Sequence, residues 1–135
     1  MDSYLRSDYR VRLAQGGCAS IRVGQPLPAA LRATLPDAGA PWGFITAWNP
    51  WSTPRPPAVN RTAQRQLLAA LRAQVPASCV RAAVGVDADG KRWREPSLFA
   101  AGVAFAVLDA LMLRFGQHAI VRGTGAGPAE LHWAP

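Results

Sequence analysis

Residues 43–52, with the sequence GFITAWNPWS, have the pattern of a central β-strand that ends in a polar, aromatic corner. The first part is a short apolar run, and Pro50 ends it. Because side chains alternate faces along a strand, Phe44, Thr46 and Trp48 are expected on one face. A strand that only fills a core has no need of a threonine, a tryptophan and an asparagine together at its exit. The corner is therefore the first place to look for a functional site.

A hairpin and one helix are expected before this strand. Polar and apolar residues alternate on both sides of a Gly-Gly turn, which predicts an opening β-hairpin over residues 9–13 and 21–23. Residues 1–8 are expected to form a short helical lead-in. Pro26 and Pro28 suit the start of a helix, and leucines at i, i+4 and i+8 over residues 27–35 give it an apolar face.

Helices and strands also alternate after the corner. Prolines at residues 54–57 suit the first turn of an amphipathic helix that is predicted to run to about residue 74. Residues 104–115 are apolar on nearly every side and predict a helix between layers. Four more strands are expected, at residues 80–86, 96–100, 118–122 and 129–133. This order predicts a single α+β domain over residues 1–135, with a mixed, mostly antiparallel sheet and about three helices packed on it.

The chain of 135 residues has a formal net charge of +7, and its basic residues are almost all arginine. Such an excess of positive charge favours the binding of nucleic acids or acidic partners. A compositional bias towards Ala and Arg is the alternative explanation. Arg61, Arg65 and Arg72 fall on one face of the helix after the corner, where they could contact phosphates while Trp48 or Trp51 stacks on bases. An ordinary solvated helix face is the alternative, and the sequence favours it.

Several classes of protein are disfavoured. No apolar run reaches the ~18 residues of a membrane span and no secretory signal begins the chain, so a cytoplasmic protein without membrane contact is expected. Cys18 and Cys79 lack the spacing of a metal or redox pair, and histidines are few, so no metal or other cofactor is predicted. Residues 123–127 are glycine-rich but lead into a strand, which argues against phosphate binding. Residues 87–90 lack a full set of calcium ligands and predict a turn.

Glu95 and Ser97 place a carboxylate and a hydroxyl at the start of a predicted strand. Glu95 could accept amide or amine hydrogens from a ligand, or act as a general acid or base if burial raised its pKa. It could equally pair with an arginine and fix a turn. His118 or His132 could act as a base, although a single histidine near a strand is more often structural.

Residues 44–50 (FITAWNP), 95–98 (EPSL) and 115–121 (FGQHAIV) follow one another in this order. Together they resemble a bacterial family known as domain of unknown function 3293. Residues 9–11 and 128–131 also fit, so the resemblance covers nearly the full chain. The first segment is quite specific, and the other two are convincing in this order.

The activity of that family is unassigned, but the resemblance implies that six polar residues belong together: Thr46, Asn49, Asn60, Glu95, Ser97 and Gln117. His118 departs from the family pattern, in which an asparagine is expected after the glutamine. Polar groups gathered at one rim of the sheet beside tryptophans suit a small polar ligand, held by hydrogen bonds and an aromatic wall. A purely structural hydrogen-bond network would use the same groups.

Three functions therefore stay open. The first is the binding of a small polar ligand or a protein partner at the corner, with the candidate ligand-binding residues Thr46, Trp48, Asn49, Asn60, Ser97 and Gln117. The second is a small cofactor-free enzyme that uses Glu95, with His118, as general acid or base. The third is nucleic-acid binding through the arginine face of Arg61, Arg65 and Arg72.

Overall fold

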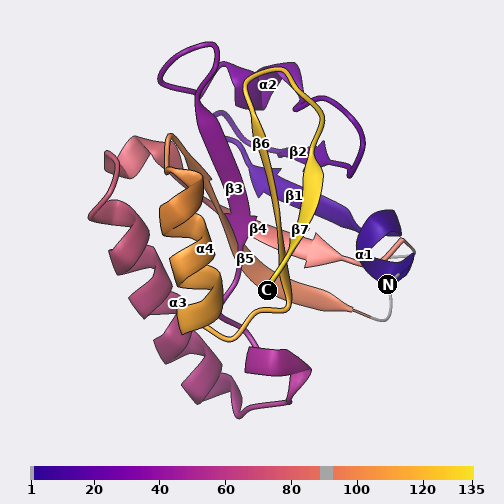
Figure 1. The fold of residues 1–135 in the computed structure, drawn as a ribbon, viewed down its shortest axis with the longest axis vertical. Helices are drawn as coiled ribbons and strands as arrows, with labels where there is room; N and C mark the ends of the chain where they lie inside the picture. Colours follow the sequence, from indigo (N-terminus) through magenta and orange to yellow (C-terminus); the bar gives the residue numbers. More distant parts are fainter. Residues whose placement is uncertain (1, 89–92) are drawn as a thin grey trace.

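The computed structural model describes residues 2–88 and 93–135, and Figure 1 shows a curved sheet with helices packed against it. The strands are β1 (Asp8–Arg12), β2 (Cys18–Ile21), β3 (Pro41–Ile45), β4 (Val80–Val86), β5 (Arg94–Ala101), β6 (Ala119–Thr124) and β7 (Glu130–Trp133). The α-helices are α1 (Asp2–Arg6), α2 (Ala29–Arg32), α3 (Pro57–Arg72) and α4 (Phe105–Arg114). Two short 3-10 turns, Pro50–Ser52 and Ala77–Cys79, precede α3 and β4.

The seven described strands form one sheet in the order β2-β1-β4-β5-β3-β6-β7, and every neighbouring pair is antiparallel. The α+β class with helices packed on one sheet is confirmed, whereas the prediction of a mixed sheet is wrong. The physical reason lies in the helical crossovers. Helix α3 joins β3 to β4, and α4 joins β5 to β6, but another strand lies between the members of each pair. No crossover therefore creates a parallel neighbour.

Two further details differ from the sequence expectation. The described chain has four α-helices instead of about three. The helical lead-in expected at residues 1–8 is confirmed as α1, and it brings the number to four. The second strand of the opening hairpin is Cys18–Ile21, shifted towards the turn from the predicted residues 21–23. In the observed register Tyr9 lies opposite Ile21. The turn expected at residues 87–90 extends beyond the described residues.

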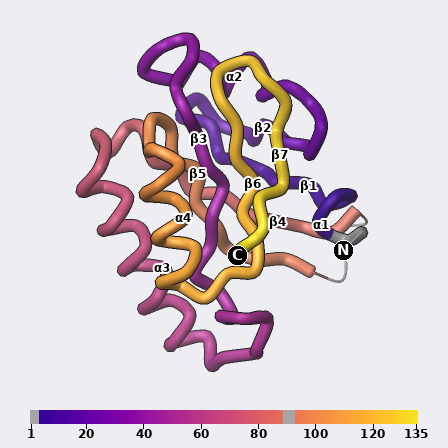
Figure 2. The backbone as a smooth tube through the Cα atoms, viewed as in Figure 1, coloured from indigo at the N-terminus to yellow at the C-terminus, as the bar shows by residue number. Residues whose placement is uncertain are grey.

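The sheet curls so that its two ends approach each other. The N–H of Gly24 donates to the carbonyl of Ala129 at 2.8 Å, and the N–H of Ala129 donates to the carbonyl of Gln25 at 2.8 Å. These bonds join the segment after β2 to the segment before β7. In Figure 2 the yellow segment that leads into β7 passes beside α2. The backbone groups of both edges are thus partly satisfied by each other.

The outer face of the sheet packs against α3 and α4, which lie side by side in Figure 1. Leu67 and Leu71 of α3 and Leu108 of α4 are fully buried there. Gly43 on β3 lets α4 approach closely, because a Cβ at this position would lie 2.7 Å from Cδ1 of Leu108. This outer core leaves the opposite, concave face of the sheet free for a second core.

The concave face buries aromatic residues along its length. Trp42, Phe44 and Phe99 are central to this second core, and Leu27 and Leu31 from the α2 region cover its upper end. The corner after β3 lies at the other end of the sheet, away from α2. Among the described helices, none is long and apolar enough to cross a membrane.

Candidate functional site

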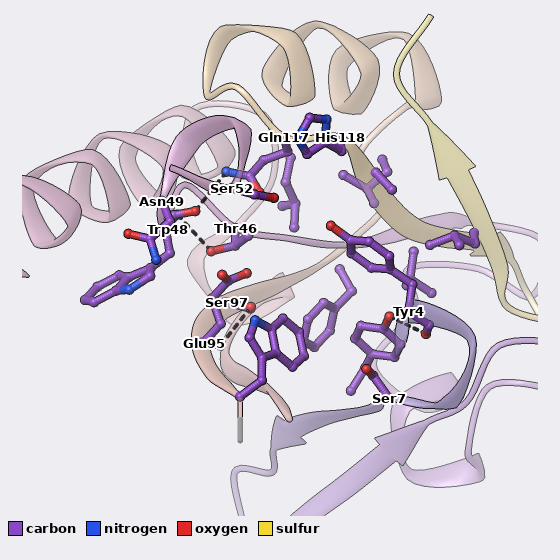
Figure 3. Close-up of a pocket in the computed structure, with 18 of the residues that line it drawn as sticks. Tyr4, Ser7, Thr46, Trp48, Asn49, Ser52, Glu95, Ser97, Gln117 and His118 are labelled. Carbon is purple, nitrogen blue, oxygen red and sulfur yellow. Dashed lines mark hydrogen bonds between the residues drawn. The ribbon is translucent and has the colours of Figure 1, made fainter. Parts of the chain in front are cut away.

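A cavity of about 490 Å³ lies on the concave face at the end away from α2. Its apolar floor continues the concave core and includes Phe44, Val121 and Leu131. These three residues form one row across the sheet, because Phe44 pairs with Val121 and Val121 pairs with Leu131. Polar residues surround the floor, as the close-up in Figure 3 shows. The size is in the range of small-molecule sites.

Glu95 is one of two acidic residues in the described lining of this cavity, and Asp87 is the other. Glu95 lies on the inner face of β5 directly opposite Gly85 of β4, which itself lies opposite Tyr9 of β1. Because Gly85 has no side chain, the indole of Trp93 lies against its backbone; a Cβ there would be 2.8 Å from Cη2 of the ring. Trp93 and Glu95 are alternate residues and therefore share the inner face.

The carboxylate of Glu95 is half-buried, and the described residues provide no compensating charge for it. No side chain in residues 2–88 or 93–135 forms an ion pair or hydrogen bond with it. Burial alone raises the pKa of Glu95 to about 7. The alternative in which Glu95 pairs with an arginine to fix a turn is therefore not found among these residues. A carboxyl with such a pKa is half protonated at neutral pH.

Two tyrosines close the cavity on the side of the chain's first residues. The hydroxyl of Tyr9 donates to the backbone carbonyl of Tyr4 at 2.6 Å, and the Tyr9 ring meets Phe44 edge to face with centroids 5.1 Å apart. Burial, and then the nearby charge of Glu95, raise the pKa of Tyr4, while a hydrogen bond with Ser52 lowers it. Burial also raises the pKa of Tyr9. Figure 3 shows Tyr4 and Glu95 directed into the same space.

Thr46 holds the corner to the neighbouring strand. Its hydroxyl donates to the carbonyl of Pro96 at 2.7 Å and accepts the N–H of Trp48 at 3.0 Å. The adjacent N–H of Ala47 donates to Oε1 of Gln64 on α3 at 2.9 Å. Thr46 thus lines the cavity, but its hydroxyl already donates one hydrogen bond and accepts another within the protein.

Asn49 and Asn60 brace the next part of the corner. The N–H of Asn49 donates to Oδ1 of Asn60 at 2.9 Å, and Nδ2 of Asn60 donates to Oδ1 of Asn49 at 2.7 Å. Asn49, Trp51 and Ser52 have positive φ angles of 45°, 55° and 58°. Such conformations cost on the order of 1–3 kcal/mol each and persist only where the surroundings impose them. The paired asparagines supply part of that constraint.

Gln117 ties the corner to the segment before β6. Its Nε2 donates to the carbonyl of Trp48 at 3.2 Å and to that of Phe115 at 3.1 Å. His118 is exposed, and its ring meets Trp51 edge to face with centroids 5.2 Å apart. Figure 3 shows the His118 ring at the rim, directed away from Glu95. The structure therefore does not bring His118 and Glu95 into contact as a pair.

The structure brings seven of the eight candidate residues to the wall of one cavity: Thr46, Trp48, Asn49, Glu95, Ser97, Gln117 and His118. Asn60 is buried behind Asn49 and does not line it. The hydroxyl of Ser97 donates to the backbone carbonyl of Glu95 at 3.1 Å. Trp48 lies at the margin, and Figure 3 shows its indole directed away from the other labelled residues.

The aromatic wall comes instead from residues that sequence reasoning did not select: Tyr4, Tyr9 and Trp93. Two of them carried a usable signal. Tyr9 begins an alternating strand, and Trp93 lies two positions before Glu95, so both could have been placed on an inner face. Tyr4 gave no such signal, because only the packing of α1 against β7, where its ring meets Trp133 at 5.3 Å, brings it to the cavity.

The arginine face lies elsewhere. Arg61, Arg65 and Arg72 are exposed on α3, the helix that covers the outer face of the sheet, and none of them lines the cavity. Within the described part of the chain, no group of three or more metal-ligating side chains is present. The two cysteines are free thiols, with Cys18 exposed and Cys79 partly buried.

The fold and site define an α+β domain whose curled antiparallel sheet holds a polar cavity at one end. The sequence family described as "Protein of unknown function (DUF3293)" matches residues 45–120, which is more than half of the chain, and the chain belongs to this family. The resemblance expected from the sequence is thus confirmed over this span, while residues 9–11 and 128–131 lie outside it. The matched span contains the corner, Glu95 and Gln117. Comparisons with curated proteins and with solved structures gave no match.

Proposed function

We propose that this chain binds a small polar ligand in the cavity on the concave face. The observation that carries the proposal is the Glu95 carboxylate, which faces the cavity without an ion pair or hydrogen bond from any described side chain. A carboxylate withdrawn from water is normally paired, because desolvation without compensation is costly. A ligand that donates hydrogen bonds would provide the missing compensation.

The other polar residues support this proposal by holding the cavity in shape. Thr46, Asn60 and Gln117 donate hydrogen bonds to the protein itself, across the corner between β3, β5 and α3 and towards β6. A rigid wall lowers the entropic cost of ligand binding. In this proposal these residues position the site, and Glu95 contacts the ligand.

Acid–base catalysis is a second candidate that one specific observation favours. Burial brings the pKa of Glu95 to about 7, so this carboxyl can both accept and donate a proton at neutral pH. Tyr4 faces the same space and feels the charge of Glu95, so its hydroxyl is a candidate partner in proton transfer. Because the ring of His118 points to the rim, the catalytic role proposed for it becomes secondary. Conversion of a bound compound that stops in Glu95→Gln would establish this function.

A thermal-shift screen tests the binding proposal. The wild-type protein is heated with separate compounds from several classes: amines, amino acids, nucleotides, sugar phosphates and short single-stranded nucleic acids. A ligand present at 100 times its dissociation constant adds about 2.7 kcal/mol of stability, which is readily detected. We expect a hit that stabilises the wild type and Glu130→Gln, an exposed control on β7, but fails to stabilise Glu95→Gln. A hit list identical for all three proteins would overturn the proposal.

The same screen covers the remaining possibilities. Stabilisation by nucleic acid that is lost on substitution of Arg61 and Arg65 would favour the arginine face of α3 instead of the cavity. If the corner instead binds a protein partner, the small-molecule screen should give no hit. The exposed Trp51 would then be the expected contact residue for that partner. The cytoplasmic location expected from the sequence stays a prediction.

A further inference from the structure

We infer that the ligand of this cavity is a small organic cation, with an ammonium or guanidinium group that lies against Glu95 between aromatic rings. This inference rests on the proposed ligand-binding function and names its chemical class. It draws on three features of the cavity: the sign of its charge, the character of its walls, and the partners already taken by its polar groups.

The described walls of the cavity carry charge of the opposite sign to that of the protein. The chain has a formal net charge of +7, yet the charged residues among the described lining are Asp87 and Glu95, and none of the described arginines takes part. A cavity whose walls carry one sign of charge concentrates ligands of the other sign. An anionic ligand would meet two carboxylates without a positive partner from these walls.

Of the two carboxylates, Glu95 is the one available to a ligand. Oδ1 of Asp87 already accepts the backbone N–H of Trp93 at 3.4 Å, and Asp87 has a further interaction within the protein. Glu95 receives neither an ion pair nor a hydrogen bond from the described side chains. A carboxylate and an ammonium or guanidinium group form short, charge-assisted hydrogen bonds, which are stronger than neutral ones.

The walls around Glu95 suit an organic cation better than a metal ion. Tyr4, Tyr9, Phe44 and Trp93 all line the cavity. The indole of Trp93 lies over Gly85, the residue directly opposite Glu95, so that ring and carboxylate share one stretch of the inner face. Aromatic faces attract organic cations within about 6 Å, most strongly when water is excluded. The described residues offer no cluster of three ligands for a metal.

This arrangement gives cation binding a distinctive dependence on pH. Among the described residues, the titratable groups that line the cavity with Glu95 are Tyr4 from α1, Tyr9 from β1, Asp87 after β4 and His118 before β6, while β3 contributes none. A cation binds the ionised form of Glu95, whose pKa is about 7 in the free protein. Affinity should therefore rise with pH, by up to ~30-fold between about pH 5.5 and pH 8.

A matched set of three probes tests the inference: phenethylammonium, 2-phenylethanol and 3-phenylpropionate, which share a ring and differ in charge. Each is titrated into the full-length protein while amide and indole resonances are followed by NMR. We expect saturable shifts at Trp93 and the residues around Glu95 for the ammonium compound, with affinity at least ten times that of the alcohol and no binding of the carboxylate. Tighter binding of the alcohol or the carboxylate in this cavity would overturn the cation inference while supporting the proposed ligand-binding function.

The pH series separates Glu95 from its neighbours. The rise in affinity with pH should disappear in Glu95→Gln, persist in His118→Asn, and persist in Glu130→Gln, whose side chain lies outside the cavity. The wild-type series is informative even if Glu95→Gln fails to fold. Absence of saturable shifts with the ammonium compound, or an affinity that falls as pH rises, would contradict the inference.

Discussion

Gly85 on β4 lies directly opposite Glu95 on β5, and the absence of a side chain at Gly85 gives the indole of Trp93 its place in the cavity. A methyl group on Gly85 would lie 2.8 Å from Cη2 of that ring, so the ring would have to move. We expect Gly85→Ala to displace Trp93, weaken ligand binding and lower the free energy of unfolding by about 1–3 kcal/mol through overpacking. Chemical denaturation and the indole N–H resonance of Trp93 measure these effects.

Gly39→Ala is the matched control for this substitution. A methyl group at Gly39 meets only Oδ1 of Asp37, at 3.9 Å, and should change neither the Trp93 resonance nor ligand affinity. An unchanged Trp93 resonance in Gly85→Ala would show that the contact between ring and backbone does not position the indole.

The stability of the protein should fall as pH rises from about 4.5 to about 7 because of Glu95. Burial raises the pKa of this carboxyl from 4.5 to about 7, so between these values the folded chain holds a proton that the unfolded chain has released. The contribution is fully present below the unfolded pKa and is lost as pH rises through the folded one. The free energy of unfolding should therefore decrease across this window, by on the order of 3 kcal/mol. Denaturation at a series of pH values measures the slope.

Glu95→Gln should flatten this part of the pH profile and be more stable than the wild type above neutral pH. Glu130→Gln changes an exposed glutamate and should keep the wild-type slope. Equal slopes in the wild type and Glu95→Gln would mean that Glu95 titrates near its ordinary value, and the catalytic alternative would lose its support.

The pair of Asn49 and Asn60 should matter for stability more than for ligand contact. Asn60 is buried, accepts the N–H of Asn49 and donates to its side chain, and does not line the cavity. Asn60→Ala leaves both groups of Asn49 without these partners and should cost about 2–4 kcal/mol. Gln66→Ala, on an exposed position of the same helix, should cost less than about 0.5 kcal/mol. Thermal denaturation compares the two, and equal stabilities would contradict a bracing role for Asn60.

Much of this arrangement could be predicted from local sequence patterns. Alternation along residues 43–48 predicts a shared face for Phe44, Thr46 and Trp48. Phe44 and Thr46 line the cavity, whereas Trp48 comes after the end of β3 at Ile45 and its indole points away from the other labelled residues. The strand at residues 80–86 was predicted with the bounds that it has. These features depend on neighbouring residues, so a single sequence contains them.

What could not be predicted depends on pairing between distant segments. Tyr9 reaches the cavity because β1 pairs with β4. The neighbouring strands are all antiparallel because β5 lies between β3 and β4, and β3 lies between β5 and β6. The pairing of distant strands depends on which arrangement buries the apolar surface of the whole chain. It leaves no periodic pattern in the sequence. The same reason explains why Asn60 was grouped with the ligand-binding residues. Its polarity was visible in the sequence, whereas its position behind Asn49 was not.

Thr46 offers a final test that separates a structural residue from a ligand contact. Its hydroxyl joins the carbonyl of Pro96 to the N–H of Trp48 and so fixes the corner to β5. Thr46→Val keeps the shape of the side chain but removes both hydrogen bonds, and it should lower the free energy of unfolding by about 1–3 kcal/mol. Thr46→Ser keeps the hydroxyl and should retain most of that stability. If Thr46 only positions the corner, the loss of ligand affinity should parallel the loss of free energy of unfolding. Both losses should then be large in Thr46→Val and small in Thr46→Ser, measured where both variants are fully folded. A loss of affinity in Thr46→Val without a loss of stability would instead identify the hydroxyl as a direct ligand contact.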